Sequence, residues 1–217
     1  SPLMKPINTF LTILFISLLS SPSWSETMDV LVERDGLYYK NFVKFTGNIT
    51  RGIFNDWDTL GAVKNGKKEG SWVEYWFGDL LKSKGNYKNG KKDGVWMQSH
   101  SNGQLEKKGN YRNGKEEGPW VEYSRIGVLW RKSNYKNGKW EGAYQTTFSH
   151  RLGGDKGNYK NGMRDGLWFY YWGNGQLRFK GNLKENMFEG AWVGYNKDGT
   201  VFKPMTGIFK NGEKISD

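Results

Sequence analysis

The side chains best suited to binding or chemistry recur in columns spaced 24 residues apart. The largest form an aromatic column: Trp72, Trp96, Trp120, Tyr144, Trp168 and Trp192. Strands lie about 4.8 Å apart, so rings in successive two-strand units would stand about 10 Å apart, as in a platform that stacks sugars. However, a thin sheet must bury its largest apolar groups to offset the entropy of ordering its chain. We therefore expect this column to form the core, with a ligand platform as the alternative.

Four tryptophans outside the aromatic column are candidate binding residues: Trp76, Trp130, Trp140 and Trp172. Trp76 and Trp172 share one register position, which other units fill with His100, Ser124, Phe148 and Asn196. A position that varies this freely is not expected to be required by the repeat geometry. Irregular exposed rings can mark a partner site, although scattered surface rings are also ordinary.

A basic column stands beside the predicted turns, at Lys64, Lys88, Arg112, Lys136 and Lys160, and continues to Lys184 and Lys210. An acidic column runs parallel to it, at Glu69, Asp93, Glu117, Glu141, Asp165 and Glu189. One interpretation is a solvated, ion-paired edge that keeps the sheet from pairing with other chains. The other is a surface for an anionic partner, such as lipid headgroups, acidic glycans or an acidic protein.

Enzymatic chemistry has no candidate site. The acidic column repeats with the fold and precedes a glycine each time, which indicates a role in turns. The chain has no cysteine and only two histidines, His100 and His150, which we expect to be solvated. Gly153-Gly154-Asp155 resembles a calcium-binding repeat but occurs once. Phosphate loops, nucleophile elbows and zinc-binding histidine pairs are missing. We expect no catalytic residue, no metal and no small-molecule cofactor.

These columns belong to a tandem repeat. The phrase Gly-Asn-Tyr-Lys-Asn-Gly-Lys-x-(Asp/Glu)-Gly-x-Trp recurs with starts at Gly61, Gly85, Gly109, Ser133, Gly157 and Gly181. Asn-Gly pairs such as Asn89-Gly90 mark one turn of each unit, and pairs such as Asn102-Gly103 mark a second. Both supply the positive φ that two-residue type I′ turns need, so each unit is predicted to be two strands. The fold class is all-β: an elongated, single-layer antiparallel β-meander.

The units resemble the bacterial variant of the MORN repeat, with its pattern YKNGKxxGxWxxY…NGxLxxxG, over roughly residues 36–214. The resemblance implies a twisted antiparallel sheet with a groove, made of tandem MORN-like hairpins. Relatives are described as scaffolds, as membrane-contact modules and sometimes by an antitoxin label, which suits an exported chain poorly. The expected organisation is an N-terminal segment with a degenerate first repeat at 26–60, six repeats of 24 to 26 residues at 61–206, and a partial repeat at 207–217.

Residues 1–25 have the features of a secretory signal peptide. Met4 and Lys5 precede an apolar run, Phe10–Leu19, and small residues at Ser23 and Ser25 flank Trp24. The run is shorter than the ~20 residues of a spanning helix, so cleavage after Ser25 is expected, with an uncleaved anchor as the alternative. Ser1–Leu3 are interpreted as a cloning scar or an upstream reading-frame remnant. The expected location is periplasmic, extracellular or cell-surface.

Composition agrees with a binding protein built of strands. Glycine contributes 30 of 217 residues, aromatic residues 16%, and the net charge is +11. Export makes nucleic acid an unexpected partner. The leading hypothesis is a non-catalytic scaffold for a protein or an anionic envelope component. The alternatives are a carbohydrate- or cell-wall-binding module that uses aromatic rings, and an accessory or inhibitor protein of a separate enzyme or toxin.

Overall fold

The computed structural model describes residues 32–34, 37–40, 43–44, 46–53, 56–76, 79–147 and 153–217. The expected signal peptide (1–25) and two residues considered above, Phe148 and His150, lie outside the described residues. Strands account for most of the described chain, and the helical element in it is a single 3₁₀ turn, η1 (Lys203–Met205).

The strands form one long meander and a small separate sheet. The separate sheet pairs β1 (Val32–Arg34), β2 (Leu37–Lys40) and β3 (Val43–Lys44). The meander begins with β4 (Gly47–Ile53), β5 (Asp56–Lys64), β6 (Lys67–Tyr75), β7 (Leu81–Lys88), β8 (Lys91–Ser99), β9 (Leu105–Arg112), β10 (Lys115–Tyr123) and β11 (Leu129–Lys136). It continues with β12 (Lys139–Trp140), β13 (Gly142–Thr146), β14 (Gly154–Lys160), β15 (Met163–Arg164), β16 (Gly166–Tyr171), β17 (Leu177–Lys184), β18 (Met187–Gly194), β19 (Gly207–Lys210) and β20 (Glu213–Ser216).

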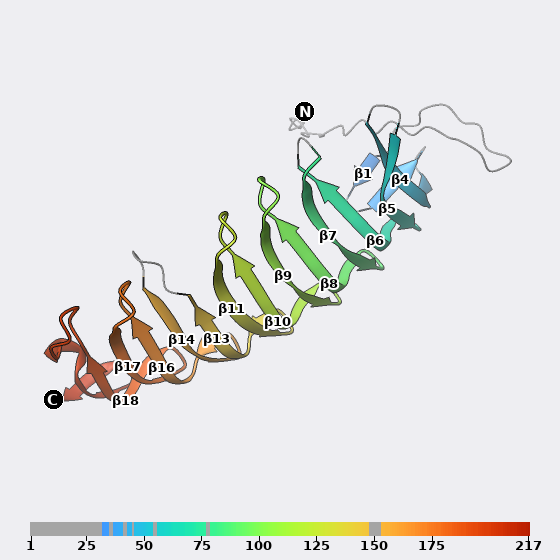
Figure 1. The fold of residues 1–217 in the computed structure, drawn as a ribbon. Coiled ribbons are helices and arrows are strands. Elements are labelled where there is room, and N and C mark those ends of the chain that lie inside the picture. Colours follow the sequence, from blue (N-terminus) through green and yellow to red (C-terminus); the bar gives the residue numbers. More distant parts are fainter. Residues whose placement is uncertain are drawn as a thin grey trace, which may run out of the picture.

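The meander is an open, elongated sheet. Each arm pairs antiparallel with the arms before and after it in the sequence. Figure 1 shows the hairpins side by side, with β4 toward one end and the chain end that follows β20 at the other. This confirms the predicted all-β, single-layer antiparallel meander. Strands β1, β2 and β3 are not part of the meander, because they form a sheet of their own.

The turns on one long edge are the predicted type I′ turns. In the turn after β7, Asn89 has φ 52° and Gly90 has φ 79°, and the exceptional pair Glu185-Asn186 adopts φ 51° and 70°. Two successive positive φ angles define this turn, whose twist matches that of its strands. We call this border of the sheet the turn edge.

The opposite border is here called the tip edge. The connections on it that the structure describes completely are not type I′ turns, so that part of the prediction is wrong. Only Gly103 of the Asn102-Gly103 pair has a positive φ, 82°. The amide of Gly103 donates to the His100 carbonyl at 2.9 Å, and the amide of His100 donates to the Gln104 carbonyl at 2.8 Å. A type I turn followed by a left-handed glycine gives this three-residue loop.

A bulge bends each arm before its column aromatic residue. In β10, Glu117 pairs with Asn110 while Val121 pairs with Lys108, so Gly118, Pro119 and Trp120 together face the single residue Gly109. Gly118 adopts φ 70°, which a glycine reaches without strain. The same bend separates β12 from β13 and β15 from β16.

The aromatic column is the core, as expected. Its tryptophans are between 0% and 4% exposed and Tyr144 is 9% exposed. Trp72, Trp96, Trp168 and Trp192 each donate Nε1–H to a backbone carbonyl ten residues earlier, at 2.8–3.0 Å. Tyrosines fill the spaces between them edge to face; for example, Tyr111 lies 6.1 Å from Trp96 and 5.1 Å from Trp120 between ring centroids. The core is therefore one ring deep and runs along the molecule.

Candidate functional site

The predicted basic column lies along the turn edge, where each residue ends a strand. Lys64, Lys88, Arg112, Lys136 and Lys160 are all exposed. Most of these residues face a second cation across the turn. For example, Lys88 pairs with Lys91 and Lys136 pairs with Lys139. Like charges directly opposite each other destabilise a sheet. The turn geometry itself does not require these like-charged pairs.

The acidic column is bonded to the backbone. Glu69 accepts a hydrogen bond from the backbone amide of Asn89 at 2.8 Å, and Glu117 accepts one from the backbone amide of Asn137 at 2.9 Å. Asp93 and Glu141 hold the turn 20 residues later in the same way, and Glu189 holds the turn 22 residues later. Among the residues that the structure describes, no ion pair includes a cation of the basic column. These acids act as clamps between units. The turn edge has an excess of positive charge because the basic column and the cations across the turn outnumber the acids.

A hollow interrupts the turn edge between two units. It has a volume of about 320 Å³ and is lined by Lys115, Lys136, Asn137, Lys139, Glu141 and Asn161. Glu141 accepts a hydrogen bond from the backbone amide of Asn161 at 2.7 Å, so one carboxylate oxygen of Glu141 is already occupied. Three lysines around one carboxylate give the hollow the character of an anion site.

The candidate tryptophans have different surroundings. The Nε1–H groups of Trp76 and Trp172 donate to the Ser99 and Tyr195 carbonyls at 3.0 and 3.1 Å, each 23 residues further on. Trp140 is half-buried against the core, 4.8 Å from Tyr159 between ring centroids. Trp130 is 40% exposed, with the Arg131 guanidinium 4.6 Å from its ring. Trp130 is thus the candidate ring most accessible to a ligand.

The register position shared by Trp76 and Trp172 has a structural role that the sequence did not reveal. His100 occupies the same position, and its Nε2 lies 2.9 Å from the Tyr123 carbonyl, again 23 residues further on. Indole and imidazole side chains thus link three hairpin tips to the next unit. Ser124 and Asn196 at the same position instead bond within their own tips, to the backbone amide of Val128 at 3.2 Å and to the Thr200 hydroxyl at 3.0 Å. The repeat therefore also forms with side chains that do not make this link, in keeping with the variability of the position.

The structure also brings together a row of lysines that was not among the predicted site residues. Lys84, Lys108, Lys132, Lys156 and Lys180, here called the face row, lie on the sheet face opposite the buried aromatic column. Strand pairing places one other side chain between each lysine and the next. In order from Lys84 to Lys180, these side chains are Met97, Val121, Gln145 and Phe169. All five lysines are exposed. Their 24-residue spacing was the available signal, but it does not reveal which residues lie between them.

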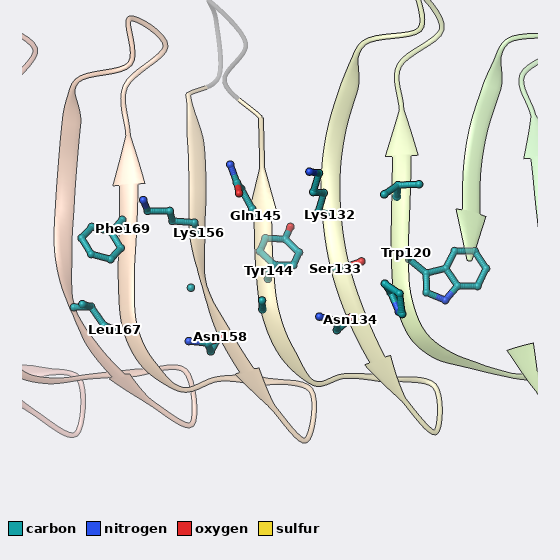
Figure 2. Close-up of a pocket in the computed structure, with 14 residues that line it drawn as sticks. Trp120, Lys132, Ser133, Asn134, Tyr144, Gln145, Lys156, Asn158, Leu167 and Phe169 are labelled. Carbon is teal, nitrogen blue, oxygen red and sulfur yellow. The ribbon is translucent and has the colours of Figure 1, made fainter. Parts of the chain in front are cut away.

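A second hollow lies on this face, with a volume of about 560 Å³. Figure 2 shows Lys132, Gln145, Lys156 and Phe169 at one level across β11, β13, β14 and β16. Asn134, Asn158 and Leu167 lie at a second level, nearer the turn edge. Ala143 also lines the hollow, and its small side chain helps leave this part of the face open.

Burial changes the pKa of two ionisable groups on the inner face, Tyr111 and Lys92. Burial, reinforced by Glu116, raises the pKa of Tyr111, so its hydroxyl stays protonated and donates to Glu116 at 3.2 Å. Desolvation lowers the pKa of Lys92, whose ammonium lies 4.3 Å from the Trp96 ring centroid. Arg131 donates from Nε to Glu122 at 3.0 Å in a part-buried pair. These contacts stabilise the sheet around the aromatic core.

The described part of the chain contains no helix with the length and apolarity that crossing a membrane requires. In that same part, no three His, Cys, Asp or Glu residues are grouped so that they could hold a metal ion.

No protein-family model and no curated protein sequence matches the chain. Its classification therefore rests on its architecture, which is that of a tandem antiparallel β-hairpin repeat protein.

Proposed function

We propose that this chain is a bacterial MORN-repeat variant protein that acts outside the cytoplasm as a non-catalytic scaffold and binds an anionic component of the cell envelope along its turn edge. The repeat phrase supports the family, and the apolar run before Ser25 supports export. The observation that carries the binding proposal is the charge arrangement of the turn edge. Exposed cations face each other in like-charged pairs, while the neighbouring carboxylates are bonded to backbone amides.

The spacing of these cations suits an extended partner. With two strands per unit, successive members of the basic column stand about 10 Å apart. The Debye length at physiological salt is about 8 Å, so neighbouring potentials overlap only partly and an anionic surface is attracted by several charges at once. A basic residue near an acidic membrane contributes about 1 kcal/mol. A column of five therefore supports strong, salt-sensitive attachment.

The alternative of a carbohydrate-binding module that uses its tryptophans has less support. The indole N–H groups of Trp76 and Trp172 are already bonded to carbonyls of the next unit, and Trp140 packs on the core. Trp130 alone is a weak basis for a ring platform. An anionic partner bound by the turn edge uses side chains that the fold leaves exposed.

The test reverses the charge of the turn edge. The full chain and the triple variant Lys88→Glu/Arg112→Glu/Lys136→Glu are compared for co-sedimentation with phosphatidylglycerol vesicles across a salt series. Three charges at about 1 kcal/mol each correspond to roughly a 100-fold loss of affinity at low salt. Wild-type binding is expected to weaken steeply as salt rises, and circular dichroism verifies that the variant remains folded.

A matched control carries the same charge change on the tip edge, as Arg125→Glu/Lys197→Glu/Lys203→Glu. These three side chains are also exposed. The control is expected to keep most of the wild-type affinity. Binding that does not depend on salt, or equal binding by wild type and the turn-edge variant, would contradict the proposal and leave the basic column as protection for the sheet border.

A further inference from the structure

The face row has the chemistry of a site for a linear polymer that carries regularly repeated charge. Its lysines are exposed and in single file, and the strand spacing sets them about 10 Å apart. The residues between them are half-buried Met97, Val121 and Phe169 and the exposed amide Gln145. The row thus alternates a cation with a less polar contact, whereas the turn edge sets cation against cation.

The hollow over β11, β13, β14 and β16 adds specific groups to this row. Lys132 and Lys156 border it and can bind carboxylate or sulfate groups. The amides of Asn134, Gln145 and Asn158 line it and offer both donors and acceptors, which suits hydroxyl groups. Groups of these two kinds, close together, match a sugar that also carries an acid.

An aromatic pair lies at the same hollow, because Phe169 lines it and stacks on Tyr171. Both rings are half-buried, with centroids 6.5 Å apart and planes inclined by 19°. The Lys156 ammonium lies 5.0 Å from the Phe169 centroid and 5.6 Å from that of Tyr171. An apolar surface beside a cation accommodates the C–H face of a pyranose while its acid group meets the lysine.

The length of the face row suits a flexible polymer. Its five lysines stand on five successive units of the meander. A flexible chain can follow the row from Lys84 to Lys180. Adhesion to a bilayer through the turn edge is a separate contact that uses other residues.

We infer that the sheet face opposite the aromatic core binds an acidic polysaccharide, held along the face row and anchored in the hollow beside Phe169. This goes beyond the proposed function, because the lysines of the face row by themselves call for an anionic ligand. The surface is a different one, so the two ideas can fail separately.

The experiment measures binding of the full chain to polygalacturonate by isothermal titration calorimetry, with neutral dextran for comparison. The double variant Lys132→Gln/Lys156→Gln is expected to lose at least about tenfold in affinity. Ala143→Phe, which fills the hollow without altering charge, is expected to weaken binding severalfold. The matched control Arg125→Gln/Lys203→Gln removes two exposed cations from the tip edge and is expected to bind as wild type does.

The contrary outcomes are distinct. Equal losses in the face-row and tip-edge doubles would mean attraction by net charge alone and would overturn the inference, as would dextran binding equal to that of polygalacturonate or no binding of either. A loss confined to Lys136→Gln/Lys160→Gln would overturn it while supporting the turn edge. The two proposals separate if the face-row double alone loses affinity for polygalacturonate while wild type and the turn-edge variant bind vesicles equally. That result would uphold this inference and contradict the proposed turn-edge function.

Discussion

At the scale of single residues, the core depends on tryptophan packed against glycine. A Cβ added to Gly109 would overlap the Trp120 indole, and the same holds for Gly85 beneath Trp96. One unit departs from this rule twice, with Ser133 in the glycine position and Tyr144 in the tryptophan position. Ser133 is 4% exposed and still fits, because the smaller ring beside it leaves space for a hydroxymethyl group. The two departures therefore compensate for each other.

This compensation predicts a coupling. Gly109→Ser alone is expected to lower the free energy of unfolding by about 1–3 kcal/mol, because the indole must move to admit the side chain. Combining it with Trp120→Tyr recreates the Ser133–Tyr144 arrangement, and the double variant should be more stable than the sum of the two changes by about 0.5–3 kcal/mol. Urea denaturation of the four proteins measures the coupling, and strictly additive effects would refute it.

At the scale of elements, the turn of one unit is held by the unit before it. The amide of Asn113 donates to Asp93 at 3.3 Å, and that of Asn161 donates to Glu141 at 2.7 Å, each across 20 residues. The turn amides also stack, since the Gly114 amide donates to the Lys92 carbonyl at 2.8 Å. Left-handed residues in a lone hairpin cost free energy, and these contacts help to offset that cost along the whole turn edge.

Removing one clamp tests this arrangement. Glu117→Ala takes away the acceptor of the Asn137 amide and is expected to lower the free energy of unfolding by about 0.5–1.5 kcal/mol. Glu213→Ala, which removes an exposed carboxylate from the terminal strand β20, serves as the control and should change stability by less than about 0.5 kcal/mol. Both are measured by urea denaturation. Equal stability of the two variants would show that the clamp contributes little.

At the scale of the whole molecule, each described arm of the meander pairs with its neighbours in sequence, as in other repeat proteins. Stability in such an array is close to a sum of units and their interfaces, and length is set by the number of units. Extended surfaces such as the turn edge and the face row therefore arise by repetition. A residue placed once per unit becomes a row.

Removing one whole unit should thus preserve the fold. Deletion of residues 109–132 joins Lys108 to Ser133 in register, and the protein is expected to keep its β-sheet circular dichroism and to shorten by about 10 Å in small-angle scattering. Deletion of residues 109–131 removes one residue fewer. Because a one-residue slip moves every following side chain to the opposite face of its strand, that variant is expected to lose most of its stability. Similar stability of the two deletions would contradict this account of register.

The sequence by itself determined the local structure of this protein. Asn89-Gly90 predicts its type I′ turn because left-handed φ angles depend on the residue types at the turn, and the burial of Trp96 follows from the size of the ring and the thinness of a single sheet. Only the tertiary structure decided the contacts between units. The bulge at Gly118 sets three residues against one, and a sequence period does not record that shift of register. For this reason the acceptor role of Glu69, the indole bond of Trp76, and the position of Lys132 beside the face hollow emerged only when neighbouring hairpins were packed together.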